Sequence, residues 1–411
     1  TILASMYWAY LNPTEGKNMT VPFSKAMQGY GSDFIKDMFA HARNLDLISF
    51  AGGAPGPEVY PLHDFRKASE KAFEEHGRTL MAYDGAEGVL QLRELIAERM
   101  TAMGVQSSAA DIRVVSGSQQ GIDFIARTYL DHGDTVICEY PTYLGALNSF
   151  NIFRPNYVSV LMDQDGMRMD ELEKALIANP QAKLIYTVPE FQNPTGITLS
   201  GDRRQRMVEL AEEHDVLIIE DSPYYEVRFE GEKHPPIKHF DKTGRVVYLG
   251  SFSKTLCPGV RVGWACADFE ILDRFRILKE ASDFQASTVT QFQVATYLRD
   301  NDLDAHILNL CAVYKSRRDA ALASIAEFFP NNVEYTKPEG GYFIWLTIPE
   351  VNTTELLLRA MNEMGVAYVP GEFFFAGGEQ NCNIRLSYSQ MSEVKIHEGI
   401  SRLGMLLSSL S

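Results

Sequence analysis

Residues 246–254 read Val-Val-Tyr-Leu-Gly-Ser-Phe-Ser-Lys, an apolar run that ends abruptly in hydroxyl groups and a lysine. Similar runs recur between residues 110 and 270, each followed by a polar cluster and usually by a segment with helical periodicity. Runs that are apolar on both faces are typical of strands covered by helices on both sides. The sequence therefore predicts an α/β fold with a mostly parallel sheet. The predicted strands are Ile112–Val115, Thr135–Cys138, Lys183–Val188, Val216–Ile219, Val246–Leu249 and Gly263–Ala267.

The segments between these runs have the periodicity of amphipathic helices. One face is expected to hold Ile122, Ile125, Ala126 and Tyr129, and another to hold Met207, Leu210 and Ala211. From residue 300 on, helices with an acidic surface alternate with isolated strands at Gly341–Leu346 and Asn383–Ser387, which predicts a smaller α+β domain. No long Pro- or Ser-rich linker occurs, so the domains should be intertwined. We expect an N-terminal arm (1–60) that joins the small domain, a large domain (61–300) and a C-terminal small domain (301–411).

The composition argues against several classes of partner. Lys and Arg total 38 against 54 for Asp and Glu, and this formal charge of −16 would repel nucleic acid and anionic membranes. The five cysteines contain no CxxC pair, so neither a disulfide framework nor a zinc ribbon is expected, and a cytoplasmic location fits. The nine histidines show no close metal-ligand spacing. We therefore expect a small-molecule ligand without a metal.

Polar clusters follow the predicted strands, where ligands bind in open α/β sheets. The clusters are Ser116-Gly117-Ser118-Gln119, Tyr140-Pro141-Thr142-Tyr143, Gln192-Asn193-Pro194-Thr195-Gly196, Glu220-Asp221-Ser222-Pro223-Tyr224 and Ser251-Phe252-Ser253-Lys254. A lysine at a strand end is normally a solvated surface residue. Here Ser251, Ser253 and Arg261 supply donors for a phosphate dianion, and nearby cations would lower the pKa of Lys254 toward that of a nucleophile. A phosphate site beside an amine is what a pyridoxal 5′-phosphate (PLP) Schiff base requires.

Three other clusters allow both a structural and a functional interpretation. Asp221 could cap a turn, or it could face a pyridine nitrogen and keep it protonated. Tyr143 is either a core aromatic or a side chain that stacks on a flat ring. Ser118 and Gln119 lie where a strand passes into a helix, so they either form a capping box or direct donors at an anion.

The roles of Asn193 and Arg385 also have two interpretations each. Asn193-Pro194 is a turn signature, but the amide could also donate to a ring hydroxylate. Arg385 lies on a predicted buried strand, where a lone guanidinium is costly without a carboxylate partner. That partner is either a structural acidic residue or a substrate carboxylate, and the sequence leaves both open.

These motifs occur in the order found in fold-type I, class I/II aminotransferases, which the chain resembles from Ile48-Ser49-Phe50-Ala51-Gly52-Gly53 to Arg385-Leu386-Ser387. It is most similar to the branch of 2-aminoadipate and kynurenine aminotransferases and the effector domains of MocR-type regulators. The resemblance implies a large PLP-binding domain, with a mostly parallel seven-stranded sheet between helices, and a smaller α+β domain.

The resemblance also implies roles for the matching residues. Lys254 forms the Schiff base, Asp221 pairs with the pyridinium nitrogen, Tyr143 stacks on the ring, and Asn193 and Tyr224 bind the ring oxygen. The phosphate is assigned to Ser118, Gln119, Ser251, Ser253 and Arg261. Substrate binding is assigned to Asn193, to Arg385, which holds the α-carboxylate, and to the covering segment at Gly52 and Gly53. Tyr83 reaches the phosphate of the neighbouring subunit, which implies a homodimer with shared active sites.

Two positions depart from the usual family pattern, with Lys36 in place of an arginine and Ala54 in place of a leucine. Lys36 lacks the planar fork that binds a distal carboxylate bidentately, and Ala54 leaves more room. We therefore expect aromatic, large apolar or 2-aminoadipate-like L-amino acids as donors, and a 2-oxo acid such as 2-oxoglutarate as acceptor. The alternatives are a PLP-dependent lyase or decarboxylase and, less favoured, a MocR-type effector domain, which would need an upstream DNA-binding segment.

Overall fold

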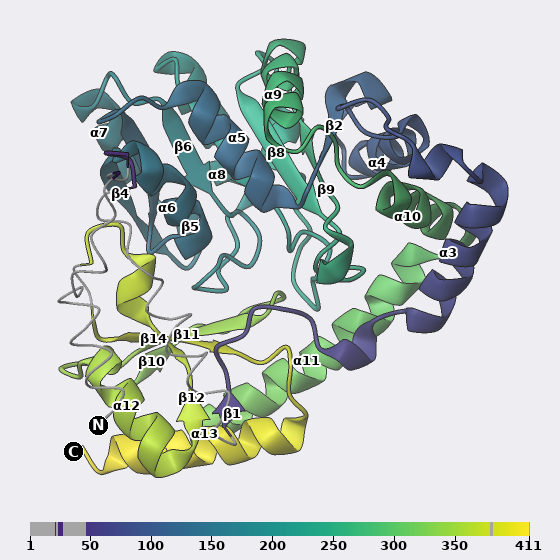
Figure 1. Cartoon of the computed structure of the whole chain (residues 1–411). Coiled ribbons are helices and arrows are strands. Elements are labelled where there is room, and N and C mark those ends of the chain that lie inside the picture. Colours follow the sequence, from purple (N-terminus) through teal and green to yellow (C-terminus); the bar gives the residue numbers. More distant parts are fainter. Residues whose placement is uncertain (1–20, 22–23, 28–46, 379–380, 411) are drawn as a thin grey trace.

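The computed structural model describes residues 21, 24–27, 47–378 and 381–410. Its largest feature is an eight-stranded sheet in the order β2-β9-β8-β7-β6-β3-β4-β5 (Figure 1). These strands are β2 (Ile112–Val115), β3 (Thr135–Tyr140), β4 (Asn156–Asp163), β5 (Gly166–Met167), β6 (Leu184–Thr187), β7 (Leu217–Asp221), β8 (Val246–Ser251) and β9 (Gly263–Cys266). β4, β3, β6, β7 and β8 pair in parallel, whereas β9 is antiparallel to both of its neighbours. The prediction of a mostly parallel sheet is confirmed, and all six apolar runs form strands.

The expected count of seven strands is wrong by one. The eighth strand is the two-residue β5, which pairs antiparallel with β4 across the turn at Gln164-Asp165. β4 lies near the sheet edge, where Val160 is its one fully buried residue. Its sequence therefore has no distinct apolar run, and the strand was not predicted.

Helices cover both faces of the large sheet. The helices are α3 (Leu62–His76), α4 (Leu90–Ala102), α5 (Ser118–Tyr129), α6 (Leu144–Phe150), α7 (Met169–Ala178), α8 (Gly201–Glu213), α9 (Phe269–Ser282), α10 (Thr288–Asp300), α11 (Leu303–Phe328), α12 (Thr353–Met364) and α13 (Glu393–Ser408). Ile137, Ile185 and Ile218 pack in one buried cluster with residues of α7 and α8. The alternate residues Tyr186 and Ile219 belong to a second cluster, which contains the buried face of α5. The amphipathic faces predicted for α5 and α8 are confirmed, with Tyr129 only partly buried.

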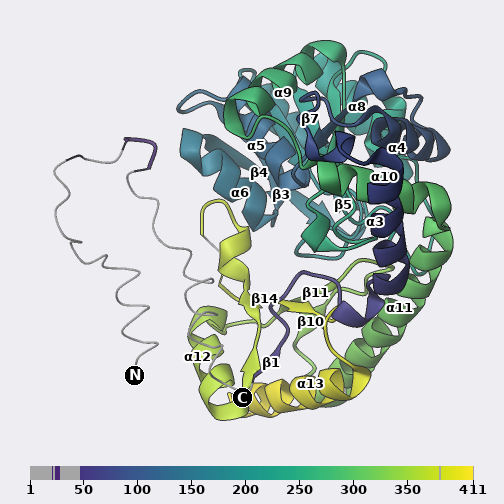
Figure 2. The same ribbon diagram turned by 45° about the vertical axis from the view of Figure 1, so that its right-hand side comes forward.

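A second group of elements contains a four-stranded antiparallel sheet in the order β10-β11-β14-β13. Its strands are β10 (Glu334–Tyr335), β11 (Phe343–Thr347), β13 (Val369–Pro370) and β14 (Asn383–Ser387), and β1 (Ile48–Ser49) pairs in parallel with β12 (Val366–Ala367). α11 runs from the neighbourhood of α10 to α13, along one side of the molecule (Figure 2). Residues 48–49 thus join elements close to the C-terminus, as an intertwined chain requires. The domain limits at residues 60 and 300 remain a prediction.

No helix in the described ranges is both long enough and apolar enough to cross a bilayer. Lys36, one of the two departures from the family pattern, lies outside the described residues.

Candidate active site

The polar clusters after β2, β3, β6, β7 and β8 converge on one central cavity of about 170 Å³. Parallel strands present their carboxyl ends at the same edge of a sheet, which brings distant segments together there. Ten predicted site residues line this cavity: Ser118, Gln119, Tyr143, Asn193, Asp221, Tyr224, Ser251, Ser253, Lys254 and Arg261. Gly53 contacts Lys254, and Arg385 contacts Asn193, so both lie next to the same site. Tyr83 does not line it.

Lys254 follows β8 and extends into the central cavity. Its Nζ donates to the carbonyl oxygen of Gly53 at 2.5 Å and lies 5.6 Å from the ring centroids of both Tyr224 and Tyr342. Burial, together with the nearby charge of Arg385, lowers the pKa of Lys254 to about 8. The amine is therefore a better nucleophile at neutral pH than an exposed lysine.

Asp221 ends β7 and is almost completely buried. Its Oδ2 accepts a hydrogen bond of 2.9 Å from Tyr186, whereas Oδ1 has no hydrogen-bond partner among the described residues. Burial raises the pKa of Asp221 to about 6, while the hydrogen bond from Tyr186, the charge of Lys254 and the nearby Ser118 side chain act in the opposite direction. A buried carboxylate oxygen without a donor is a strong acceptor for a protonated ring nitrogen.

Several hydrogen-bond donors gather where β2 passes into α5. Gly117 precedes the helix with φ 82°, and a Cβ built there would lie 2.2 Å from Arg261 Nη2. Arg261 donates to the carbonyl oxygen of Ser116 at 2.9 Å and approaches Ser253 Oγ at 3.5 Å, while Ser251 Oγ donates to Ser253 Oγ at 2.9 Å. Helix N–H groups, two hydroxyls and a guanidinium thus surround one corner of the cavity and could hold a phosphate.

A buried lysine that the sequence analysis missed, Lys279, forms hydrogen bonds to the turn that carries these donors. Lys279 Nζ on α9 donates to Ser116 Oγ at 3.1 Å, to Gln120 Oε1 at 2.7 Å and to Asp283 Oδ2 at 2.9 Å. Gln120 Oε1 also accepts from the backbone N–H of Ser116. No local motif marks Lys279, because it lies 163 positions from Ser116 in the chain. The network holds the turn before α5 against Arg261.

Arg385 on β14 has no carboxylate partner among the described residues. Its Nη1 donates to Asn193 Oδ1 at 2.9 Å and its Nη2 to the carbonyl oxygen of Ala51 at 2.7 Å, while Nε has no hydrogen-bond partner. The guanidinium lies 4.3 Å from the ring centroid of Phe343 and 5.0 Å from that of Phe374. Burial lowers the pKa of Arg385 to about 10, so the group stays charged at neutral pH. No ion pair between described residues explains this residue.

The remaining predicted residues occupy different environments. Tyr143 precedes α6, and its hydroxyl lies 3.4 Å from Gln119 Oε1. Gln119 Nε2 donates to Gly145 O and Ser149 Oγ, so its side chain is held toward α6. Tyr83 is 85% exposed and contacts the ring of Phe284 at 5.9 Å between centroids.

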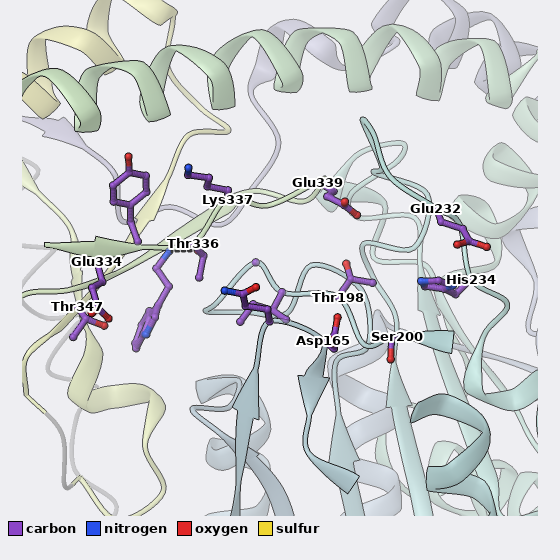
Figure 3. A pocket seen from close by; sticks show the side chains of 15 residues that line it. Asp165, Thr198, Ser200, Glu232, His234, Glu334, Thr336, Lys337, Glu339 and Thr347 are labelled. Atoms are coloured by element: carbon purple, nitrogen blue, oxygen red, sulfur yellow. Dashed lines mark hydrogen bonds between the residues drawn. The ribbon is translucent and has the colours of Figure 1, made fainter. Parts of the chain in front are cut away.

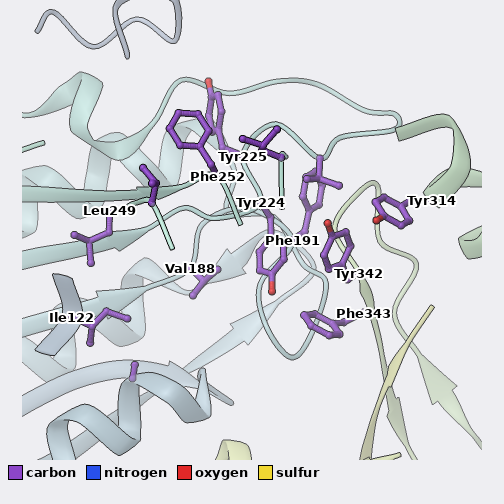
Figure 4. Close-up of a cluster of buried hydrophobic side chains, with 14 of the residues drawn as sticks. Ile122, Val188, Phe191, Tyr224, Tyr225, Leu249, Phe252, Tyr314, Tyr342 and Phe343 are labelled. Carbon is purple, nitrogen blue, oxygen red and sulfur yellow. The ribbon is translucent and has the colours of Figure 1, made fainter. Parts of the chain in front are cut away.

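An aromatic cluster packs beside the site (Figure 4). Tyr342 donates to the carbonyl oxygen of Lys254 at 3.0 Å and packs edge-on against Tyr224 and Tyr314. The sequence analysis missed Tyr186, in β6, and Tyr342, directly before β11, because aromatic residues in or beside buried strands resemble ordinary core positions. Both contact residues that the sequence did identify.

A second, larger cavity of about 720 Å³ lies between the loop at Thr198–Ser200 and strands β10 and β11 (Figure 3). Its walls carry Asp165, Glu232, Glu334 and Glu339, together with His234 and Lys337. None of the predicted site residues lines it. No cluster of three or more potential metal ligands occurs in the parts of the chain that the structure describes.

The sequence profile of "Aminotransferase class I and II" matches residues 47–403. The chain belongs to this family. Aromatic-amino-acid aminotransferase 1 of Thermococcus litoralis is 40% identical over 386 residues, or 93% of each chain. The 2-aminoadipate transaminase of Thermus thermophilus is 32% identical, over 94% of this chain and 97% of that protein. A crystal structure of Pyrococcus horikoshii kynurenine aminotransferase, in complex with PMP, matches with a TM-score of 0.91 and 38% identity, over 94% of this chain and 97% of that one.

The protein is a PLP-dependent aminotransferase of fold type I, as its sequence predicted. The central cavity of this aminotransferase fits the cofactor. Asp221 Oδ1, which has no hydrogen-bond partner among the described residues, could accept from a protonated ring nitrogen, and Lys254 Nζ reaches the same cavity. The corner at Gly117 and Arg261 supplies the donors for a phosphate, and a side chain at position 117 would overlap the guanidinium.

We expect Lys279→Met to release PLP about tenfold faster than the unchanged aminotransferase, because losing donors to two buried acceptors costs roughly 1–3 kcal/mol. Ser116 and Gln120 lose the amine that fixes them, so the turn before α5 should loosen. The loss of cofactor absorbance during dilution or dialysis measures this rate.

Lys238→Met is the matched control. Lys238 is also largely buried and bonds Asp241 and the carbonyl oxygen of Val246, at the opposite end of β8 from Lys254. Equal PLP release from the two variants would mean that Lys279 has no particular effect on the phosphate corner.

Proposed function

We propose that this aminotransferase moves amino groups from aromatic or large apolar L-amino acids to a 2-oxo acid such as 2-oxoglutarate. Lys254 attaches the cofactor in this proposal, and Arg385 holds the α-carboxylate of each substrate. The observation that carries it is the buried guanidinium of Arg385, which no described carboxylate neutralises. A buried charge of this kind is costly until a partner arrives, and both the amino acid and the 2-oxo acid bring a carboxylate.

The surroundings of Arg385 support an apolar donor side chain. Phe343 and Phe374 stack on the guanidinium, and Tyr140 and Phe375 pack close by, with ring centroids 4.6 Å apart. Aromatic rings offer favourable contacts to an aromatic or aliphatic side chain and no partner for a second carboxylate. The relative from Thermococcus litoralis is named for aromatic amino acids, and the Pyrococcus horikoshii enzyme was crystallised with kynurenine, in agreement with this assignment.

Bound PLP supplies an electron sink for the charge that develops at Cα of the amino acid. In our proposal Asp221 keeps the ring nitrogen protonated, which requires the ionised carboxylate that Tyr186 helps to stabilise. Tyr143 covers one face of the ring, and Asn193 and Tyr224 hold its oxygen. With the cofactor bound, the neutral amine Nζ of Lys254 would accept the proton from Cα. Ser251, Ser253, Arg261 and the start of α5, with Ser118 and the backbone of Gln119, hold the phosphate.

A homodimer is part of the proposal. Tyr83, Phe284 and Met81 are 85%, 66% and 75% exposed, and the rings of the first two are in contact. Large apolar side chains exposed together favour an interface. A second copy that covers them would bring each Tyr83 toward the phosphate of its neighbour. The cytoplasmic location also stays a proposal, supported by free thiols at Cys138, Cys257, Cys266 and Cys311.

No observation favours the lyase or effector-domain alternatives. A comparison of amino donors, with and without a 2-oxo acid, separates transamination from these alternatives. We expect L-phenylalanine, L-leucine and L-kynurenine to give kcat/KM values at least equal to that of L-2-aminoadipate, with 2-oxoglutarate as acceptor. Arg385→Lys should weaken all four donors, because each shares the α-carboxylate. A preference of tenfold, about 1.4 kcal/mol, for L-2-aminoadipate would contradict the proposed donor class. Sustained turnover without any 2-oxo acid would indicate a lyase.

The lowered pKa of Lys254 leads to a prediction about cofactor attachment. We expect the rate of covalent PLP attachment to the apoenzyme to rise with pH and level off above about 8, because the neutral amine is the nucleophile and burial favours it. Stopped-flow absorbance measures the rate. Lys254→Ala should show no covalent attachment at any pH. A rate that keeps rising through about pH 10, as for an unperturbed lysine, would contradict the lowered pKa.

The third prediction concerns the shared site. Tyr83→Phe should weaken PLP retention, because the hydroxyl that reaches the neighbouring phosphate is lost. Mixed dimers of Tyr83→Phe and Lys254→Ala should regain activity, since one site then combines Lys254 from one subunit with Tyr83 from the other. Mixing Tyr83→Phe with a variant that carries both changes should restore nothing. An aminotransferase that is monomeric and fully active at assay concentration would exclude the shared site.

A further inference from the structure

A second buried carboxylate lies close to the central cavity without lining it. Glu139, in β3, is 2% exposed. Its Oε1 accepts from Thr187 Oγ1 at 2.6 Å and from the backbone N–H of Val188 at 3.2 Å, and its Oε2 accepts from Gln192 Nε2 at 3.0 Å. The strand register places Glu139 beside Thr187 and two strands from Glu220, on the sheet face that α7 and α8 cover.

Gln192, the residue that Glu139 holds, is fully buried and has every side-chain polar atom engaged. Its Nε2 donates to Glu139 and also to the carbonyl oxygen of Pro141 at 2.8 Å. Its Oε1 accepts from the backbone N–H of Thr195 at 2.9 Å and from Thr195 Oγ1 at 2.7 Å. The amide cannot turn over without placing its NH2 group against the Thr195 N–H, so its orientation is fixed.

This pair connects two loops that face the site from different directions. Pro141 belongs to the loop after β3 that carries Tyr143, and Gln192 is directly followed by Asn193. Asn193 Oδ1 in turn accepts from Arg385 Nη1. A path of hydrogen bonds and one peptide link therefore runs from Glu139 to the guanidinium of Arg385.

We propose that Glu139 is a positioning residue for substrate carboxylate binding, which acts through Gln192 and Asn193 to orient Arg385. The inference rests on the proposed role of Arg385. Glu139 touches neither the central cavity nor Arg385, so its effect is transmitted by the loop. The geometry of a bidentate guanidinium clamp is sensitive to such support, because both N–H groups must point at the same carboxylate.

An amide at position 139 cannot replace the carboxylate. Thr187 donates to Oε1, Gln192 donates to Oε2, and the backbone N–H of Val188 is shared between the two oxygens, so each oxygen of Glu139 accepts from at least one N–H group. Glu139→Gln keeps the shape but turns one acceptor into an NH2 donor. At the Oε2 position this NH2 faces the Gln192 donor, and at the Oε1 position it faces the Val188 N–H, although the Thr187 hydroxyl can turn to accept from it. One buried donor must then lose its partner or move, which costs roughly 1–3 kcal/mol.

Glu220 provides a matched control on the same sheet face. It is fully buried, and burial raises the pKa of both Glu139 and Glu220 to about 7. Its oxygens accept from the backbone N–H groups of Ile237 and Lys238 at 2.8 Å each, at the start of a short helix (Ile237–Phe240). Glu220→Gln therefore creates a comparable mismatch that is not connected to Asn193 or Arg385.

The test measures binding of 3-phenylpropionate, an aromatic carboxylate without an amino group, to the PLP-loaded enzyme by titration calorimetry. We expect Glu139→Gln to bind it about tenfold more weakly, and to raise KM for L-phenylalanine about tenfold with a smaller change in kcat, whereas Glu220→Gln should stay within about twofold. Gln192→Met cuts the same connection and should behave like Glu139→Gln. The double variant should bind 3-phenylpropionate no more weakly than the weaker-binding single variant, because both changes interrupt the same path.

Wild-type binding of 3-phenylpropionate by either Glu139→Gln or Gln192→Met in folded form would overturn the inference. An equal loss in Glu220→Gln would also overturn it, because general softening of the sheet would then explain the effect. Gln192→Met keeps the test decisive if Glu139→Gln does not fold. Arg385→Lys is titrated alongside: if it binds as tightly as the unchanged enzyme, the proposed role of Arg385 fails, whereas a loss there with none in Glu139→Gln refutes only the role of Glu139.

Discussion

The unpaired Oδ1 of Asp221 is the constraint on which the active site depends. A carboxylate in this position is costly to keep ionised, and burial raises its pKa to about 6 despite the hydrogen bond from Tyr186 and the charge of Lys254. A protonated ring nitrogen would remove that cost. The same low-dielectric surroundings lower the pKa of Lys254, so one physical effect prepares both the acceptor for the ring and the amine that attaches it.

The active-site groups lie at the ends of strands, and hydrogen bonds from buried polar side chains fix the loops that follow these strands. Lys279 fixes the turn before α5, Glu139 and Gln192 fix the loops after β3 and β6, and Tyr342 bonds the backbone of Lys254. Each contact satisfies buried polar atoms that would otherwise destabilise the fold. Stability and positioning therefore come from the same hydrogen bonds, and a comparison with a matched buried residue is needed to separate them.

The central cavity and the larger cavity beside β10 and β11 differ in the side chains that line them. The central cavity gathers Lys254, Asp221 and Arg261 from three strand ends, next to the buried Arg385. The larger cavity between Thr198 and β11 gathers carboxylates, His234 and Lys337 at the outer edges of two sheets. Size alone would not select the central cavity, which is the smaller of the two. The presence of a nucleophile, an unpaired carboxylate oxygen and phosphate donors selects the first.

The sequence by itself determined the central strands and the polar residues that follow them, because apolar runs on both faces and the clusters at their ends are local features. It missed β4, whose side chains are mostly exposed or only partly buried, and it could not choose between a structural and a substrate partner for Arg385. Only the tertiary structure shows the surroundings of Arg385, which contacts Asn193 across 192 positions and has no acidic partner among the described residues. The same holds for Lys279 and Glu139, because the environment of a buried charge is set by segments that are far apart in the chain.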